Sequence, residues 1–298
     1  MATLDTAPRL LLKNILFATD FSPISDKAAA FAAALAHKYG SKVLVTHVLP
    51  EAEPGVAHPD QISERDAQAK AEAERCLADY KNNGIFSAVA HEELLLSGDM
   101  VQTLAATIEQ KEVDLIVLGT HGRGGISDLF MGSIAEDIFR HISCPVLTVG
   151  PKVKFPEAHE VNIERVLFAT DLAHGPHALP FALSLAEENN ARLMMLHVVQ
   201  ATVMFNDIVP DEWSDKAKNN MREMLPADAT LAYEPELIVG VGNPSEEIVN
   251  VAIEKQADII VMGVHTGPPS ASHAPWAIAH QVVGHAPCPV LTVKVAAE

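Results

Sequence analysis

The chain has 298 residues, of which 39 are acidic and 21 basic, and its formal net charge is −18. Such a surface repels nucleic acid and anionic membranes, so neither is an expected partner, although backbone donors and a divalent cation can still hold a phosphate ligand. The sequence shows neither a signal peptide nor the roughly 20 consecutive apolar residues of a membrane span, so we expect a soluble, cytoplasmic protein.

Strands and helices are predicted to alternate strictly through the first half. The helices carry their own start and stop signals, such as Gly40 after an alanine-rich run and a capping box formed by Asp99 with Gln102. In chain order, we expect a strand over 14–19, a helix over 25–39, a strand over 42–48, a loop over 50–60, a helix over 63–82, a strand ending near 96, a helix ending near 111, a strand over 114–119, a glycine-rich loop over 120–130, a helix over 133–141 and a strand over 145–149.

The second half repeats the first. ILFATD at residues 15–20 returns as VLFATD at 166–171, and SCPVLTV at 143–149 returns as PCPVLTV at 287–293. The length also suits two domains of about 150 residues each. We therefore expect one domain over 1–150, a linker over 151–162 and a second domain over 163–298.

Some of the expected strands are apolar throughout, as in LIVLG at 115–119. This pattern is typical of parallel strands covered by helices on both faces. The predicted fold is α/β, with two tandem doubly wound parallel sheets of five strands and flavodoxin-like layering. The apolar closing strands are expected to pair with each other. Any ligand should lie beyond the carboxyl ends of the strands.

A glycine loop follows the strand over 115–119, with the spacing Gly119-x-x-Gly122, nine residues, then Gly132-Ser133. The first two glycines let the backbone approach an anion and turn where a side chain would block it. The last pair offers N–H groups and a hydroxyl at a helix amino terminus, which favours phosphate. Arg123 could add a cation or could simply be solvated.

The second half has lost this loop. The corresponding positions hold Thr266, Pro268, Pro269, Trp276 and Ala277. Proline removes backbone donors, tryptophan fills space, and alanine lacks the hydroxyl. Because the signals of the fold persist there without the glycines, the glycines of the first half should serve more than folding.

The loop, together with THGRGG at 120–125 and the closing SCPVLTV, resembles the ATP-binding pattern of the universal stress protein family, and the resemblance runs from about Leu11 to Lys294. It implies a fold like that of the adenine nucleotide alpha hydrolases, with ATP, accompanied by Mg²⁺, across the first and fourth strands. The contacts that it implies are Ala18, Thr19, Asp20 and Val48 to adenosine, with Leu118 and Gly119 nearby, Gly122, Gly132, Ser133 and Ile134 to the phosphates, and Gly98 at the mouth.

Asp20 recurs as Asp171 in the half without the loop. Its carboxylate could bind a nucleoside or could hold the following turn and helix start, and both interpretations are kept.

Histidines also recur, and His47 with His197 indicates a structural role. Some histidines near the carboxyl edge of the second sheet could instead bind a metal, since imidazole suits zinc. They are His174, His177, His265 and His273.

No nucleophile is paired with a base, so no catalytic residue is named. The leading hypothesis is a stress-response regulatory protein that binds ATP or ADP in its first half and acts through conformation or a protein partner. The alternatives are slow hydrolysis of ATP or of a phosphate ester, and a nucleotide-free interaction protein. By resemblance, the two halves should pair like the family's single-domain dimers, and two chains could form a homodimer.

Overall fold

The structure is a computed structural model that describes residues 11–50, 59–120, 138, 141–142, 144–154, 161–172, 177–200, 211–265 and 274–295. The chain divides into two compact units, one built on Leu12–Val146 and one on Leu147–Lys154 with Asn162–Glu298. Within the described part of the chain, no helix is both long and apolar enough to cross a membrane.

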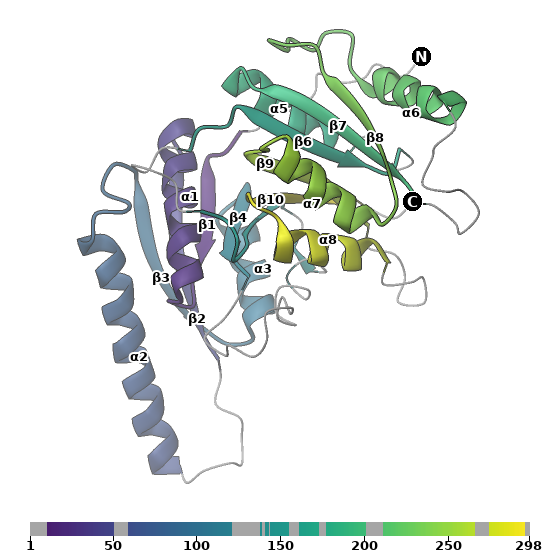
Figure 1. The fold of residues 1–298 in the computed structure, drawn as a ribbon. Helices are drawn as coiled ribbons and strands as arrows, with labels where there is room; N and C mark the ends of the chain where they lie inside the picture. Colours follow the sequence, from purple (N-terminus) through teal and green to yellow (C-terminus); the bar gives the residue numbers. More distant parts are fainter. Residues whose placement is uncertain are drawn as a thin grey trace. The chain divides into compact units, whose positions relative to one another are not determined.

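The first unit is a parallel sheet with helices packed against it (Figure 1). Its elements are β1 (Asn14–Ala18), α1 (Pro23–Tyr39), β2 (Lys42–Leu49), α2 (Pro59–Asn82), β3 (His91–Ser97), α3 (Met100–Gln110) and β4 (Leu115–Gly119). The strand order is β3-β2-β1-β4, and every pair is parallel. Because parallel crossovers are right-handed, α1 and α2, which lead toward β3, cover one face, and α3, which leads back to β4, covers the other.

Helix α1 packs closely on the sheet because its side chains are small. Every residue from Ala28 to Ala36 is buried. The Ser22 hydroxyl caps the start of the helix by accepting from the backbone N–H of Ser25, and Gly40 ends it in the left-handed region at φ 67°. The predicted helix is confirmed, and its start lies two residues earlier because proline suits the first helical position.

Helix α2 begins at Pro59, four residues before its predicted start, so the predicted loop over 50–60 is wrong at its end. A proline at the first helical position again explains the earlier start. Residues 65–72 are all exposed, whereas Ala73, Leu77 and Tyr80 are buried. The helix is therefore anchored by its last third, and Figure 1 shows its first turns extending past the strands of this unit.

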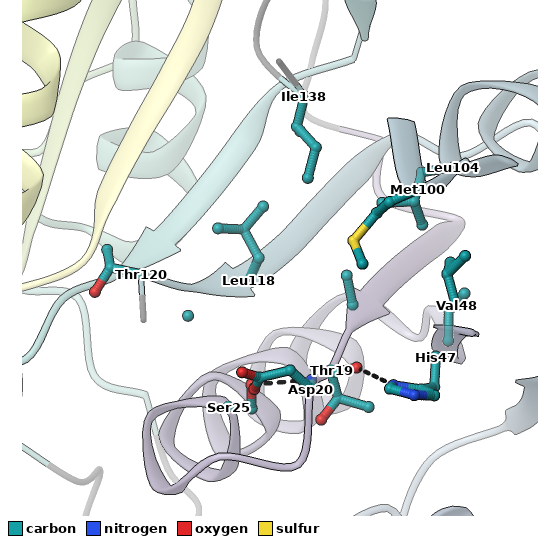
Figure 2. Close-up of a pocket in the computed structure, with 13 residues that line it drawn as sticks. Thr19, Asp20, Ser25, His47, Val48, Met100, Leu104, Leu118, Thr120 and Ile138 are labelled. Atoms are coloured by element: carbon teal, nitrogen blue, oxygen red, sulfur yellow. Dashed lines mark hydrogen bonds between the residues drawn. The ribbon is translucent and has the colours of Figure 1, made fainter. Parts of the chain in front are cut away.

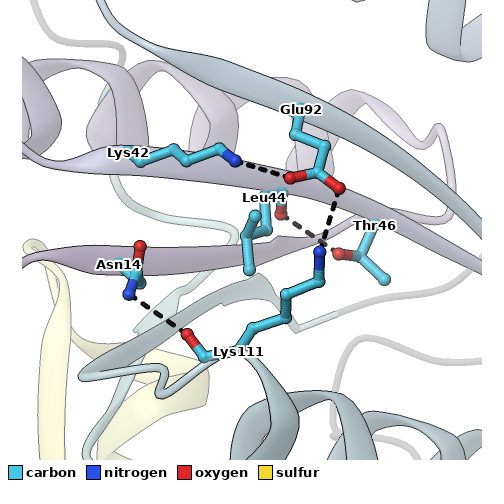
Figure 3. A network of polar contacts seen from close by, with 6 residues as sticks. All are labelled: Asn14, Lys42, Leu44, Thr46, Glu92 and Lys111. Carbon is cyan, nitrogen blue, oxygen red and sulfur yellow. Dashed lines mark hydrogen bonds and ion pairs between the residues drawn. The ribbon is translucent and has the colours of Figure 1, made fainter.

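A polar network lies at the amino ends of the strands (Figure 3). The Glu92 carboxylate pairs with Nζ of Lys42 at 2.6 Å and with Nζ of Lys111 at 3.0 Å. The hydrogen bonds from Lys42 and then Lys111 lower the pKa of Glu92 below its ordinary value. The side-chain amide of Asn14 donates to the Lys111 carbonyl at 3.1 Å. These contacts join three strands and a helix at the edge opposite the carboxyl ends.

The second unit repeats this plan. Its elements are β5 (Val146–Val149), β6 (Arg165–Thr170), α5 (Leu179–Asn189), β7 (Arg192–Val199), α6 (Asp211–Met224), β8 (Glu236–Val241), α7 (Pro244–Glu254), β9 (Ile259–His265), α8 (Ala274–His285) and β10 (Val290–Val295). The strand order is β5-β10-β9-β6-β7-β8. The two closing strands are thus neighbours within this unit, as predicted. Helix α6 has 14 residues and is thus shorter than α2, which has 24.

Backbone geometry recurs at matching positions of the two units. Phe21 and Leu172, which follow the first strand of each unit, have φ values of 62° and 65°. Gly98 and Gly242 have φ values of 135° and 126°, in the region that favours glycine. The repeat therefore extends to turns that most side chains avoid.

Side-chain contacts recur as well. Oδ2 of Asp114 accepts from the N–H groups of residues 13 and 14 at 2.7 and 2.9 Å, and Oδ2 of Asp258 accepts from those of residues 164 and 165 at 2.8 Å each. The predicted cap at Asp99 is confirmed, with an N–H to Oδ1 distance of 2.9 Å, and Asn243 caps the matching helix of the second unit at 3.0 Å. These positions hold the fold in both units.

Candidate functional site

A cavity of about 160 Å³ lies at the carboxyl ends of β1, β2 and β4 (Figure 2). Strand β1 pairs with β2 on one side and with β4 on the other. The strand order therefore reverses its direction at β1. Parallel α/β sheets bind their ligands at such a point. Six predicted contacts line the cavity, namely Ala18, Thr19, Asp20, Val48, Leu118 and Gly119.

Gly98, predicted at the mouth, is not among the described residues that line this cavity. Gly98 is buried, and its N–H donates to the Leu49 carbonyl at 3.0 Å, so its positive φ serves the turn between β3 and α3. The predicted phosphate contacts lie outside the described residues, and they are Gly122, Arg123, Gly132, Ser133 and Ile134.

An apolar wall faces these residues, and the sequence analysis did not identify most of it. Met100 and Leu104 lie one turn apart on α3, and Figure 2 shows them with Ile138 around the cavity. The spacing of four residues at the start of a helix directly after Gly98 was the available signal. Such a wall suits the apolar face of a ring. The other lining residues that were missed are Ser25, Thr46, His47 and Thr120.

The two oxygens of Asp20 have different surroundings. Oδ1 accepts from the N–H of Ser22 at 3.0 Å and from the hydroxyl of Ser25 at 2.5 Å. Oδ2 is buried and has no hydrogen-bond partner among the described residues. The first oxygen thus holds the turn that leads into α1, which is one of the two interpretations left open by the sequence. The second is a buried acceptor, unused among the described residues, on a residue that lines the cavity.

The backbone of Thr19 is fixed from two directions. Its N–H donates to the Thr46 carbonyl at 2.9 Å, and its own carbonyl lies 2.7 Å from Nδ1 of His47. A carbonyl only accepts, so Nδ1 of His47 carries the proton. In the second unit, Nδ1 of His197 lies 3.0 Å from the Thr170 carbonyl. The repeated contact confirms the structural role predicted for this pair of histidines.

Gly119 has a packing role that the sequence analysis did not assign. A Cβ atom at this position would lie 2.7 Å from Cγ2 of Ile24 and 3.1 Å from the backbone N of Ser25. The absent side chain therefore lets the start of α1 approach β4. Gly263, at the matching position, is kept in the half that lacks the loop. Gly119 therefore has a packing role beside its predicted part in the approach of an anion, and that part stays a prediction.

The described lining contains no lysine or arginine, and its one carboxylate is that of Asp20. An unused carboxylate oxygen beside an apolar wall suits a flat ligand group that carries a hydrogen-bond donor. No group of His, Cys, Asp and Glu side chains among the described residues is arranged to hold a metal ion. The side chains of His174, His265 and His273 are outside that part of the chain.

Both halves match one protein family. The model of the universal stress protein family matches residues 12–150 and again residues 162–294. A universal stress protein of Thermus aquaticus is 33% identical over 142 residues, which cover 47% of this chain and 99% of that protein. A universal stress protein of Methanocaldococcus jannaschii is 31% identical over 144 residues, which cover 47% of this chain and 82% of that protein. Each of these relatives thus corresponds to about half of the chain.

A solved structure matches both halves together. The crystal structure of a universal stress protein from Archaeoglobus fulgidus covers 94% of this chain and 98% of its own, with a TM-score of 0.66 and 18% identity. At that identity the likeness shows the fold. The predicted α/β class with parallel sheets and helices is therefore confirmed.

Proposed function

The chain belongs to the universal stress protein family as a tandem two-domain member, and on that premise we propose that it is a stress-response regulatory protein whose first half binds ATP. The observation that carries the proposal is the buried, unused Oδ2 of Asp20, a residue that lines the cavity. A buried acceptor without a partner costs about 1–3 kcal/mol, and more if it is charged. A donor on a ligand would offset that cost.

Adenosine has the required groups. Its amino and ribose hydroxyl groups are donors, and its base has two apolar faces that suit the wall formed by Met100, Leu104 and Ile138. From such a position the phosphates would extend toward the glycine loop that follows β4. The retained spacing from Gly119 to Ser133 supports phosphate binding there.

Mg²⁺ is part of the proposal because the described lining offers no lysine or arginine to balance a triphosphate. Magnesium is commonly held through substrate phosphates with few protein ligands, so the absence of a metal cluster among the described residues does not oppose it.

Regulation would follow from linkage. A ligand that binds the folded chain and not the unfolded chain stabilises it, and occupancy of the site would alter the surface around it. A partner protein that contacts this surface could then distinguish the two states. Association of two chains stays a prediction, which sedimentation velocity with and without Mg-ATP would test.

The first experiment is to denature the purified full chain and to quantify the released nucleotide by mass spectrometry and absorbance. We expect about one ATP or ADP per chain, because one of the two halves keeps the glycine loop. A chain that releases none and also fails to bind added Mg-ATP would contradict the proposal. Turnover faster than about one per second would instead favour an enzyme.

A further inference from the structure

A phenol on α2 contacts the turn that carries the candidate ATP site. Tyr80 is 5% exposed, and its hydroxyl donates to Oδ1 of Asp26 at 2.8 Å. The same hydroxyl oxygen lies 3.1 Å from Oγ1 of Thr19. Because a phenol has one proton and Asp26 receives it, the hydroxyl of Thr19 is the donor in the second contact.

The hydrogen bonds therefore run in one direction. The N–H of Phe21 donates to Oγ1 of Thr19 at 3.0 Å, Thr19 donates to Tyr80, and Tyr80 donates to Asp26. Hydrogen bonds aligned in this way polarise and strengthen one another. The chain of contacts ends on a carboxylate, which is the strongest acceptor available.

The ring of Tyr80 is itself held in place. It meets the ring of Phe17 edge-on at a centroid distance of 5.6 Å and lies 6.2 Å from that of Phe86. Burial raises the pKa of Tyr80, so the hydroxyl keeps its proton across the physiological range. A fixed, protonated phenol is a suitable anchor for a neighbouring side chain.

The second unit forms the corresponding turn without a phenol. Oγ1 of Thr170 accepts from the N–H of Leu172 at 3.1 Å, and the φ value of Leu172 is 65° against 62° for Phe21. The second half has a single tyrosine, Tyr233, which is 46% exposed with its ring 4.7 Å from the guanidinium of Arg192. The turn therefore does not need a phenol to fold, and Tyr80 occurs in the half that keeps the glycine loop.

We propose that Tyr80 is a positioning residue for the nucleotide: by fixing the side chain of Thr19 it holds the neighbouring Asp20, so that the unused Oδ2 can accept a hydrogen bond from the ligand. With the contact to Tyr80, every hydrogen-bonding group of Thr19 is engaged, and Asp20 is the next residue. The inference rests on the proposed binding of ATP.

The test is a double-mutant cycle on the full chain, freed of bound nucleotide and titrated with Mg-ATP by calorimetry. Tyr80→Phe keeps the ring and removes the hydroxyl, and we expect it to raise the Kd about tenfold, the effect of one hydrogen bond. In a chain that already carries Asp20→Asn, the same change should leave the Kd unaltered, because Tyr80 acts through Asp20. A merely structural role would lower affinity to the same degree in both backgrounds.

Tyr233→Phe is the matched control, since it removes a phenol from the other half, and it should leave the Kd unchanged. Asp26→Ala, at an exposed position of α1, offers a second route if Tyr80→Phe folds poorly, and its effect should also vanish beside Asp20→Asn. The inference would be overturned, without affecting the proposed function, if Tyr80→Phe and the unchanged chain had equal Kd values. It would also be overturned if Tyr80→Phe raised the Kd by the same factor with and without Asp20→Asn. An unchanged chain that binds no Mg-ATP would overturn the proposed function as well.

Discussion

The hydroxyl of Ser25 donates a 2.5 Å hydrogen bond to Oδ1 of Asp20, while Oδ2 of the same carboxylate has no partner among the described residues. One side chain thus serves the start of α1 with one oxygen and keeps the other as an unused acceptor beside the cavity. The two roles can be separated, because asparagine keeps an oxygen for Ser25 and replaces the other acceptor with a donor.

Asp20→Asn should therefore weaken binding of Mg-ATP by at least about tenfold, since a hydrogen bond to a charged group contributes roughly 1.5–3 kcal/mol. The thermal midpoint without ligand should change little. Calorimetric titration checks the affinity. Asp171→Asn, the matching change in the half that lacks the glycine loop, should bind as the unchanged chain does, and an equal loss in both variants would refute the assignment.

Gly132→Leu should abolish nucleotide binding while the chain stays folded. A leucine side chain would occupy the space in which phosphate approaches the backbone at this predicted contact. The amount of nucleotide released per chain checks the loss of binding, and far-UV circular dichroism checks that the chain stays folded. Ala277→Leu, at an exposed position of α8, is the control and should change neither. Full occupancy of Gly132→Leu would contradict the role of the loop.

Gly119→Ala should lower the free energy of unfolding by about 1–3 kcal/mol, because the new Cβ would lie 2.7 Å from Ile24 and force α1 away from β4. Urea unfolding measures the change. Gly284→Ala in α8 is the control, since nothing lies within 4 Å of its Cβ position, and alanine in a helix should stabilise by about 0.5–1 kcal/mol. If both variants changed the free energy of unfolding in the same direction, the packing role of Gly119 would be contradicted.

Glu92→Gln should reduce stability at neutral pH by about 0.5–1 kcal/mol, a magnitude typical of solvent-screened pairs. The lysines hold the pKa of Glu92 below its ordinary value of 4.5, so its contribution is fully present above that value and disappears as the pH falls through the lowered pKa. Urea unfolding from pH 7 to pH 3 should show the two chains converging in acid. Glu236→Gln, which loses one partner, Lys255 at 2.6 Å, is the control and should cost less.

A thiol reagent at pH 8 should label about one cysteine per native chain. Burial raises the pKa of Cys144 and that of Cys288 to about 12, so roughly one in 10,000 of these thiols is ionised at that pH. Cys76 on α2 is half-buried and should react first. Peptide mass spectrometry after labelling identifies the site, and rapid modification of Cys288 would show that the core opens readily.

The alternation of elements, the cap at Asp99 and the end of α1 at Gly40 could all be predicted, because each depends on neighbours within a few residues. Other features depend on residues far apart in the chain. Nothing near Tyr80 indicates that it meets Thr19, 61 residues away, and the clash that excludes a side chain at Gly119 comes from a different element.

The cavity residues likewise divide into those that could be predicted from the sequence and those that could not. Asp20 and Val48 were found because they match a family pattern, whereas the wall contributed by Ile138 was missed because a buried isoleucine looks alike in a core and in a binding site. For Asp20, both functions considered from the sequence are compatible with the structure, since each oxygen can serve one.

The uneven anchoring of α2 gives that helix a gradient of local stability. Its exposed residues 65–72 gain little from tertiary burial, whereas Leu77 and Tyr80 are tied to the sheet. Amide hydrogens early in the helix can therefore exchange with solvent through fraying of a few turns, while those beside Tyr80 exchange only when the unit itself opens. A single helix would report separately on local motion and on the integrity of the core beside the candidate site.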